Sequence, residues 1–199
     1  MKAVCIVGSP KPKGNTSAIV AEIFRALETH NIQTQLYRLS DLNIAYCCGC
    51  KSCDTTGKCI QSDDVQKVVH DVFDAQLVIV ASPSYWGDVT GQMKVFIDRC
   101  TPYCNTNSAR LPISSSAKGV AVAVRAGGNK QENMNLVHTI EHFLGHLDIP
   151  LISYFTVEGI SSEQDLLHRP DTLADAFTFG EELSQLLKKE ETRLTLSPG

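Results

Sequence analysis

The sequence predicts an α/β fold, namely a doubly wound five-stranded parallel sheet with helices on both faces. Two observations lead to this prediction. Five apolar runs of strand length alternate with five helical patterns, and three of the runs are apolar almost throughout, as in strands that helices cover on both sides. With 199 residues and no internal repeat or linker, we expect one domain over residues 1–190, including a cysteine-rich loop at 45–61.

The first third of the chain supplies two strands and one helix. Residues 2–8 form a short apolar run, and a stretch rich in glycine and proline at 8–14 ends it. A helix begins near Asn15, with one apolar stripe made of Ile19, Val20, Ile23, Phe24 and Leu27. Residues 31–39 have a weaker strand pattern, so we expect this strand near an edge of the sheet.

The middle of the chain continues the alternation after the cysteine-rich loop. Ser62 is expected to cap a helix, with two aspartates at its positive end and an apolar stripe made of Val65, Val68, Val69, Val72 and Phe73. Residues 76–82 form the third strand, and a helix from about Asp88 follows it. A polar loop at 101–117 leads to the fourth strand at 119–125.

The last third completes the pattern. A helix carries the stripe Leu136, Val137, Ile140, Phe143 and Leu144, the fifth strand covers 149–156, and a final helix covers 172–189. The tail at 191–199 is expected to be frayed. In parallel sheets of this kind, ligands bind beyond the carboxyl ends of the strands. We therefore expect the glycine-bearing loops after strands one, three and four to meet the cysteine loop at one edge.

Composition narrows the class of protein. A net charge of -4 and a pI near 5.8 give no reason to expect nucleic acid or a membrane surface as partner. No apolar run has the length needed to span a bilayer. The N-terminal residues 1–10 are interpreted as a first strand and turn rather than an export signal. Eight cysteines without such a signal indicate metal binding or redox chemistry in the cytoplasm rather than disulfides.

The segment 40–64 is the most unusual part of the chain, because it places five of the eight cysteines within thirteen positions. Four of them follow the spacing C-x2-C-x2-C-x5-C, at Cys47, Cys50, Cys53 and Cys59. Four converging thiolates are the number that a [4Fe–4S] cluster needs, and the spacing departs from the two separated pairs of usual zinc sites. Cys48 is either spare or the true first ligand. The alternative interpretation is four reduced, free cysteines.

Residues 8–17, GSPKPKGNTS, join a buried strand to a helix. The hydroxyls of Ser9, Thr16 and Ser17, the Asn15 amide and the N–H groups of the helix can converge on one anion. The stretch is neither a Walker loop nor a dinucleotide fingerprint, and it is a turn of the kind that the phosphate of FMN would use. The alternative interpretation is an ordinary turn that starts a helix.

The loop at 83–91 places Tyr85 and Trp86 beside Gly87 at a strand end. Aromatic rings there can stack on a flat ligand, and the glycine allows close approach of the backbone. Residues 126–129, which include Gly127 and Gly128, would offer backbone N–H groups to the edge of such a ring and stabilise its reduced anion. The alternative interpretation of the aromatic pair is two core side chains.

Together these segments resemble a known family. GSPKPKGNTS, the cysteine motif followed by Asp63-Asp64, PSYWG at 83–87 and KVFIDR at 94–99 are similar to the iron–sulfur flavoproteins, which sit within the NAD(P)H-dependent FMN reductases of flavodoxin-like fold. The resemblance covers most of residues 1–130. It implies the strand order 2-1-3-4-5, FMN at the loop edge, a [4Fe–4S] cluster, and a homodimer or homotetramer that brings cluster and flavin of different subunits close.

The resemblance also assigns residues. It implies that the phosphate is held by Ser9, Lys11, Asn15, Thr16 and Ser17, and that the flavin is lined by Pro83, Tyr85, Trp86, Gly87, Gly127 and Gly128. The cluster ligands would be Cys47, Cys50, Cys53 and Cys59. Residues 101–117 and those after 150 match less clearly, so substrate specificity does not carry over.

The sequence thus predicts an FMN-dependent oxidoreductase or electron-transfer flavoprotein with a [4Fe–4S] cluster. We assign no residue as general acid or base. Electron donors would be NAD(P)H or ferredoxin, and acceptors a quinone, an oxygen species or a protein. A second hypothesis is a cluster-free NAD(P)H-dependent FMN or quinone reductase. A third, from another class, is a zinc-binding or metal-sensing module.

Two further groups of residues carry chemistry but are interpreted as structural. His138, His142 and His146 repeat every fourth residue along one helix, and without a thiolate or second element expected beside them they are interpreted as a partly solvated face. Lys94 and Asp98 are expected to form an intrahelical ion pair, and Arg99 to have a structural role.

Overall fold

The computed structural model describes residues 1–113 and 115–196, with side chains described up to Lys189. Five parallel strands form one sheet in the order β2-β1-β3-β4-β5. Their bounds are β1 Lys2–Val7, β2 Gln33–Arg38, β3 Leu77–Pro83, β4 Lys118–Val124 and β5 Leu151–Val157. This confirms the predicted doubly wound sheet and its 2-1-3-4-5 order, which is that of flavodoxin.

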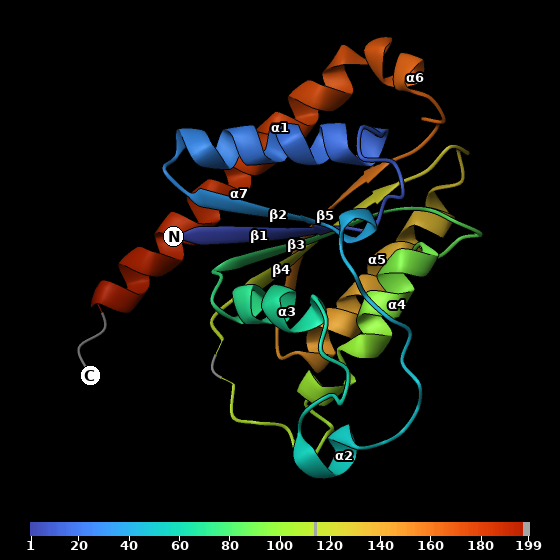
Figure 1. Ribbon diagram of the computed structural model, residues 1–199. Coiled ribbons are helices and arrows are strands. Elements are labelled where there is room, and N and C mark those ends of the chain that lie inside the picture. The colour runs from blue at the N-terminus through green and yellow to red at the C-terminus, as the bar shows by residue number, and fades with distance from the viewer. Residues whose placement is uncertain (114, 197–199) are drawn as a thin grey trace.

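Helices cover both faces of the sheet, so the core lies in two layers (Figure 1). On one side lie α1 (Asn15–Thr29) and α7 (Pro170–Leu196), and on the other α3 (Val65–Phe73), α4 (Gly91–Arg99) and α5 (Lys130–His146). Alternation along β1 shows how one strand serves both layers. Ala3, Cys5 and Val7 belong to the α1 side, whereas Val4 and Ile6 belong to the α3–α5 side.

The longest helix, α7, packs along α1, and the two helices approach each other closely at Gly180. A Cβ atom on Gly180 would lie 2.6 Å from the Ile23 carbonyl oxygen, so only glycine allows this approach. Buried Ala176, Phe179 and Leu183 extend the contact into the core. The helix continues to Leu196, past residue 190, and residues 197–199 of the expected frayed tail lie outside the described residues. Within the described residues, no helix is long and apolar enough to cross a membrane.

Two helix starts differ from the sequence expectation. Asp64, not Ser62, precedes the first residue of α3, and the Asp63 carboxylate instead accepts the Val65 N–H at 3.2 Å. The α4 helix begins at Gly91 with Thr90 as its N-cap, because residues 85–88 form a tight turn rather than helix. Thr90 accepts the Met93 N–H with its side chain and donates its hydroxyl to the Gly8 carbonyl, which joins α4 to the loop after β1.

The cysteine loop leaves the carboxyl edge of the sheet, contrary to the expectation that all unusual loops meet there. After β2 and η1 (Leu39–Asp41), the chain runs away from the sheet to the short helix α2 (Cys53–Thr56), below α3 and α4 (Figure 1). There it contacts η2 (Thr101–Tyr103), which directly follows the C-terminal end of α4. The loops after β1, β3, β4 and β5 stay together at the edge.

Candidate functional site

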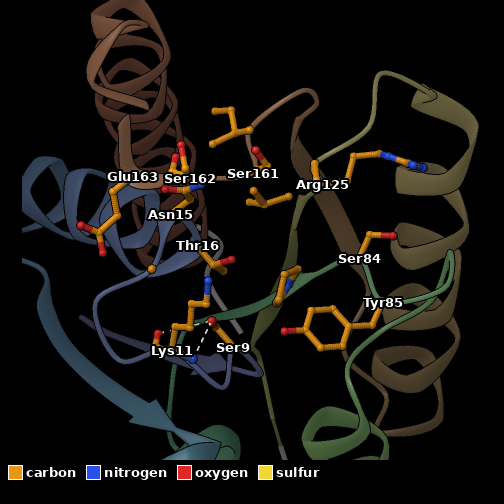
Figure 2. Close-up of a pocket in the computed structure, with 15 residues that line it drawn as sticks. Ser9, Lys11, Asn15, Thr16, Ser84, Tyr85, Arg125, Ser161, Ser162 and Glu163 are labelled. Carbon is orange, nitrogen blue, oxygen red and sulfur yellow. Dashed lines mark hydrogen bonds between the residues drawn. The ribbon is translucent and has the colours of Figure 1, made fainter. Parts of the chain in front are cut away.

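A cavity of about 190 Å³ opens where four loops meet at the carboxyl edge. Figure 2 shows its arrangement: the loop after β1 and the start of α1 form one wall, and the loop after β3 forms the opposite wall. The segments after β4 and β5 complete it. The lining residues are Ser9, Lys11, Gly14, Asn15, Thr16, Pro83, Ser84, Tyr85, Val124, Arg125, Ala126, Ile160, Ser161, Ser162 and Glu163.

The first wall has the properties of an anion site. Gly14 is the N-cap of α1, no side chain caps this helix, and its first turn holds no acidic residue. The N–H groups and the positive end of the helix dipole therefore remain available to a ligand. The hydroxyl-bearing Ser9 and Thr16 are both buried against the cavity. Ser9 Oγ accepts the Lys11 N–H at 3.2 Å, which fixes the shape of the loop.

Asn15 connects this wall to the segment after β5. Its Nδ2 donates to the Ser162 carbonyl at 3.1 Å, while its buried Oδ1 finds no hydrogen-bond partner among the described residues. A buried acceptor of this kind is normally satisfied by a donor. A ligand hydroxyl from the cavity would supply one, so the wall fits a phosphorylated polyol better than a bare apolar molecule.

The segment Ile160–Glu163 was not among the residues predicted from the sequence. It lines the cavity because a capping box, formed by Ser162 and Asp165, starts helix α6 (Glu163–Leu167) directly beside it. The Ser161 hydroxyl and the Ser161 and Ser162 N–H groups all donate to Asp165 and hold the pKa of its carboxyl well below the ordinary value. The S-x-x-D pattern was the available sequence signal.

The opposite wall ends in a tight two-residue turn. Tyr85 N–H donates to Asp88 O at 2.9 Å and Asp88 N–H returns a bond to Tyr85 O at 3.2 Å. Trp86 and Gly87 occupy the turn with φ of 57° and 76°, values typical of a type I′ hairpin turn. Tyr85 lines the cavity, whereas Trp86 projects fully into solvent at 105% relative exposure. Neither residue is a core aromatic.

The remaining predicted flavin residues lie outside this cavity. Ser17 lines a neighbouring hollow between α1 and α6, and Gly87, Gly127 and Gly128 are not in the cavity lining. The loop of Gly127 is held by Arg125, which donates to the Asn129 carbonyl at 3.2 Å and pairs with Glu132. Figure 2 shows the Arg125 guanidinium turned away from Lys11 and Asn15.

The cysteine loop forms a second candidate site at the other end of α4. All five cysteines of the motif line one small hollow of about 30 Å³, together with residues that include Asp98, Arg99, Thr101 and Pro102. Cys47, Cys48 and Cys50 are exposed, and Cys53 and Cys59 are half-buried. None is in a disulfide. The structure therefore brings the four predicted ligands and Cys48 to one place.

The spacing of the thiols bears on which metal they suit. In a tetrahedral zinc site with Zn–S bonds near 2.3 Å, sulfurs lie about 3.8 Å apart. Among the described residues, no three cysteine sulfurs lie within 4.8 Å of one another. The cysteine sulfurs are therefore not already gathered at the spacing of a tetrahedral zinc site.

Two aspartates anchor the ends of the cysteine loop. Asp64 accepts the Asn43 N–H at 2.7 Å, and Asp63 accepts the Ala45 N–H at 3.2 Å. Gln61 donates to the Tyr46 carbonyl at 3.0 Å. Both aspartates lie at the start of α3, as expected from the sequence, and their carboxylates also close the base of the loop.

Arg99 lies behind the loop, almost wholly buried, and donates to three of its parts. Nη1 binds the Ala45 carbonyl at 2.8 Å, Nη2 binds Asp63 Oδ1 at 3.2 Å, and Nη2 lies 3.6 Å from Cys59 Sγ. Burial alone would raise the pKa of Asp63, but Arg99 and the backbone donors of Ala45 and Val65 outweigh it and hold that pKa low. The structural role expected for Arg99 is thus specific: it joins α4 to a predicted cluster ligand.

The thiols of the loop differ electrostatically. Backbone and side-chain hydrogen bonds from Ser52 lower the pKa of Cys50 below its ordinary value. Burial, and then the neighbouring carboxylate of Asp54, raise the pKa of Cys53. Thiolate is the form that binds metal, so of these two cysteines Cys50 gives up its proton more readily.

Comparison with known proteins places these sites in context. The family described as NADPH-dependent FMN reductase matches residues 1–159. An iron–sulfur flavoprotein of Archaeoglobus fulgidus is 37% identical over 134 residues, which is 67% of this chain and 59% of that protein. An iron–sulfur flavoprotein of Methanocaldococcus jannaschii is 33% identical over 146 residues, which is 73% of each chain.

The solved structures agree at the level of the fold. A flavone reductase superimposes with a TM-score of 0.72 at 14% identity, covering 96% of this chain and 64% of that one. An archaeal flavodoxin superimposes with a TM-score of 0.56 at 12% identity, covering 94% of this chain and 99% of that one. The matched region thus spans less than two thirds of the Archaeoglobus relative and of the flavone reductase.

Proposed function

The chain belongs to the NADPH-dependent FMN reductase family, and from that premise we propose that it is an FMN-dependent oxidoreductase which also carries a [4Fe–4S] cluster on Cys47, Cys50, Cys53 and Cys59. The proposal of a cluster is supported by one observation above all: these thiols lie together in one hollow beside the buried Arg99. Flavin exchanges electrons singly or in pairs, and such a cluster exchanges one at a time.

The edge cavity is proposed to hold the phosphate and ribityl part of FMN. Helix α1 would contribute its N-terminal N–H groups, with Ser9, Lys11, Asn15, Thr16 and Ser17 around the phosphate. At about 190 Å³ the cavity is smaller than the roughly 300–1,000 Å³ usual for ligand pockets. The ring would therefore lie at the open side, against Pro83, Tyr85, Trp86 and Gly87, and near Gly127 and Gly128.

Arg99 is proposed to support the cluster site in two ways. Its N–H groups hold the loop through Ala45 and Asp63, which fixes where Cys59 lies. The contact from Nη2 to Cys59 Sγ places a positive group against a thiolate ligand, and hydrogen bonds to ligand sulfurs are one determinant of cluster potential. The buried Arg99 Nε has no partner among the described residues, so one further donor is present at the site.

The distance between the two sites bears on assembly. The edge cavity adjoins the N-terminal end of α4 through the bond from Thr90 to Gly8, and the cysteine hollow includes Arg99 at its C-terminal end. Nine helical residues extend about 13 Å. This separation is compatible with the proposed homodimer or homotetramer, in which a cluster would serve the flavin of another subunit.

The electron donor is proposed to be NAD(P)H or ferredoxin, and the acceptor a quinone, an oxygen species or a protein. One alternative keeps the flavin without the cluster, as an NAD(P)H-dependent FMN or quinone reductase; the small hollow and the exposure of three cysteines are compatible with it. The zinc-module alternative is less favoured, because a zinc module has no use for the cavity and the glycine-bearing loops at the carboxyl edge of the sheet.

Anaerobic purification followed by iron, sulfide, zinc and flavin analysis tests this proposal. We expect about four iron and four sulfide atoms and one FMN per chain, with broad absorption near 400 nm in addition to the flavin bands. FMN without iron would reduce the proposal to the cluster-free reductase. Zinc without bound flavin would replace it with the metal-binding module.

A further inference from the structure

The histidine stripe of α5 does have a thiol beside it, contrary to the interpretation from sequence. Cys104, which follows η2, places its Sγ 3.3 Å from His146 Nδ1. The His142 and His146 rings lie 4.5 Å apart between centroids, at an angle of 85°. These side chains line a cavity of about 560 Å³ between α4 and α5, which is separate from the edge cavity and adjoins the cysteine hollow at Asp98 and Thr101.

The position of Cys104 is fixed by the residue after it. Asn105 N–H donates to the His146 carbonyl at 2.7 Å, and its side-chain Nδ2 donates to the Gly145 carbonyl at 3.1 Å and to Asp148 at 2.9 Å. Arg110 binds the same aspartate at 2.7 Å. The loop is therefore docked on the C-terminal end of α5 by several independent bonds, and the thiol is held against the helix.

The geometry suits a tetrahedral metal ion. With Zn–N near 2.0 Å and Zn–S near 2.3 Å, a nitrogen and a sulfur ligand of one zinc lie about 3.5 Å apart, close to the 3.3 Å between His146 Nδ1 and Cys104 Sγ. His142 precedes His146 by four residues, the spacing at which two histidines of one helix bind one zinc. His142 is exposed and can rotate toward the pair without disturbing the core.

Neighbouring groups provide the support that metal ligands usually have. Thr106 Oγ1 lies 3.0 Å from Cys104 Sγ, and such second contacts orient metal ligands. Asn105 Oδ1 lies 3.2 Å from His146 Nδ1 and would give up this contact when a metal binds that nitrogen. A metal ion would replace the proton that Nδ1 now shares with these partners, so its binding releases protons. Asp98 and His138 line the same cavity and could supply a fourth ligand.

We propose that Cys104, His142 and His146 form a binding site for a borderline divalent transition metal ion, with zinc as the species to test. A rival group, His70, Asp71 and Asp74, has its donor atoms within 4.8 Å of one another, whereas His142 must turn before it reaches that spacing with Cys104 and His146. Asp71 is already bound by Lys2 at 2.6 Å and by the Tyr37 hydroxyl, however, and His70 pairs with Asp74.

The metal would have a structural consequence for the cysteine loop. Asn107, three residues after Cys104, donates from Nδ2 to the Cys53 carbonyl at 3.1 Å. Fixing Cys104 to α5 would therefore also stiffen one wall of the hollow that holds the five cysteines. The site is independent of whether that hollow binds a cluster.

Equilibrium dialysis of the purified protein, with its bound cofactors, against zinc under anaerobic conditions tests the proposal. We expect about one zinc per chain without loss of iron, and a higher thermal midpoint on zinc addition. Cys104→Ser and His142→Ala should each weaken zinc binding at least about tenfold and abolish the shift. His168→Ala, an exposed histidine elsewhere, is the matched control and should bind like the unmodified protein.

Two outcomes would overturn the proposal. One is equal zinc binding by the unmodified protein and His142→Ala, a variant at an exposed position that should fold normally. The other is zinc uptake only in proportion to iron lost, which would place the zinc on the cysteine loop. Thr106→Val offers a further check, because removing a support of the thiol should weaken zinc binding about tenfold while leaving all three ligands.

Discussion

Arg99 and Asp63 form an ion pair that is almost completely withdrawn from solvent, with 1% and 6% of their side chains exposed. The pair joins the last residue of α4 to the base of the cysteine loop. Buried charges are stable only while both partners are present. This ion pair is therefore one of the contacts that attach the loop with the predicted cluster ligands to the core, and a single substitution can break it.

Asp63→Asn should destabilise the protein by about 3–5 kcal/mol, because the Arg99 charge remains buried without its partner. The low pKa of Asp63 in the folded state gives this contribution a pH dependence. It is present above the unfolded carboxyl pKa of about 4 and is lost as pH falls through the lower folded value. Urea unfolding at pH 7 and at about pH 3 measures the free energy of unfolding of the unmodified protein and of Asp63→Asn. The difference between the two proteins should be smaller at about pH 3, and an equal difference at both pH values would contradict the role given to the ion pair.

Gly57→Ala should disrupt the cysteine loop, whereas Gly49→Ala should be milder. Both glycines have positive φ, 67° and 65°, but a Cβ on Gly57 would lie 2.1 Å from the Ala109 carbonyl oxygen, whereas on Gly49 it would meet nothing within 4 Å. Strain from φ costs each about 1–2 kcal/mol. Thermal midpoints and iron content would compare them, and equal losses would argue that the Ala109 contact is unimportant.

Cys50→Ala should abolish incorporation of the cluster while leaving FMN bound, because the two sites lie at opposite ends of α4. Cys47→Ala should do the same, and Cys48→Ala should retain iron if Cys47 is the first ligand. Iron, sulfide and flavin content report all three variants. Unchanged iron in Cys50→Ala would remove the assignment, and iron lost from Cys48→Ala but kept in Cys47→Ala would shift it by one residue.

Thr16→Val should weaken FMN binding about ten- to a hundredfold, because a hydrogen bond to a charged group contributes about 1.5–3 kcal/mol. Thr16 is only 2% exposed, and valine has nearly the same shape, so the fold should persist. Riboflavin, which lacks the phosphate, should bind both proteins equally. A parallel loss of riboflavin affinity would mean that Thr16 does not act on the phosphate.

Trp86→Asn should stabilise the apoprotein by about 1 kcal/mol and weaken FMN binding about two- to tenfold. A bulky side chain at positive φ is strained, and asparagine tolerates that conformation. The strained backbone conformation holds the Trp86 ring in solvent, where it is the expected stacking partner of the flavin. Trp86 is the single tryptophan, so FMN should quench its fluorescence in the unmodified protein. Undiminished emission on saturation with FMN would exclude the stacking.

The sheet could be predicted because its strands are short apolar runs whose period and order leave few alternatives, as in Leu77–Pro83 and Lys118–Val124. The contacts that build the sites could not. Arg99 reaches Ala45 across 54 residues and Cys104 reaches His146 across 42, and neither pair has a local pattern. The turn at residues 85–88 could not be predicted from the sequence either, because tryptophan rarely adopts positive φ.

The packing of α7 on α1 has a practical consequence for dissecting the protein. The family match ends at residue 159, eleven residues before α7 begins at Pro170. Cleavage at that boundary would uncover Ile23 and Phe24, which now lie in the same apolar layer as Ala176 and Leu183. A fragment trimmed to the shared region should therefore aggregate or dimerise through its bared helix, and the minimal autonomous unit should extend at least through Leu187.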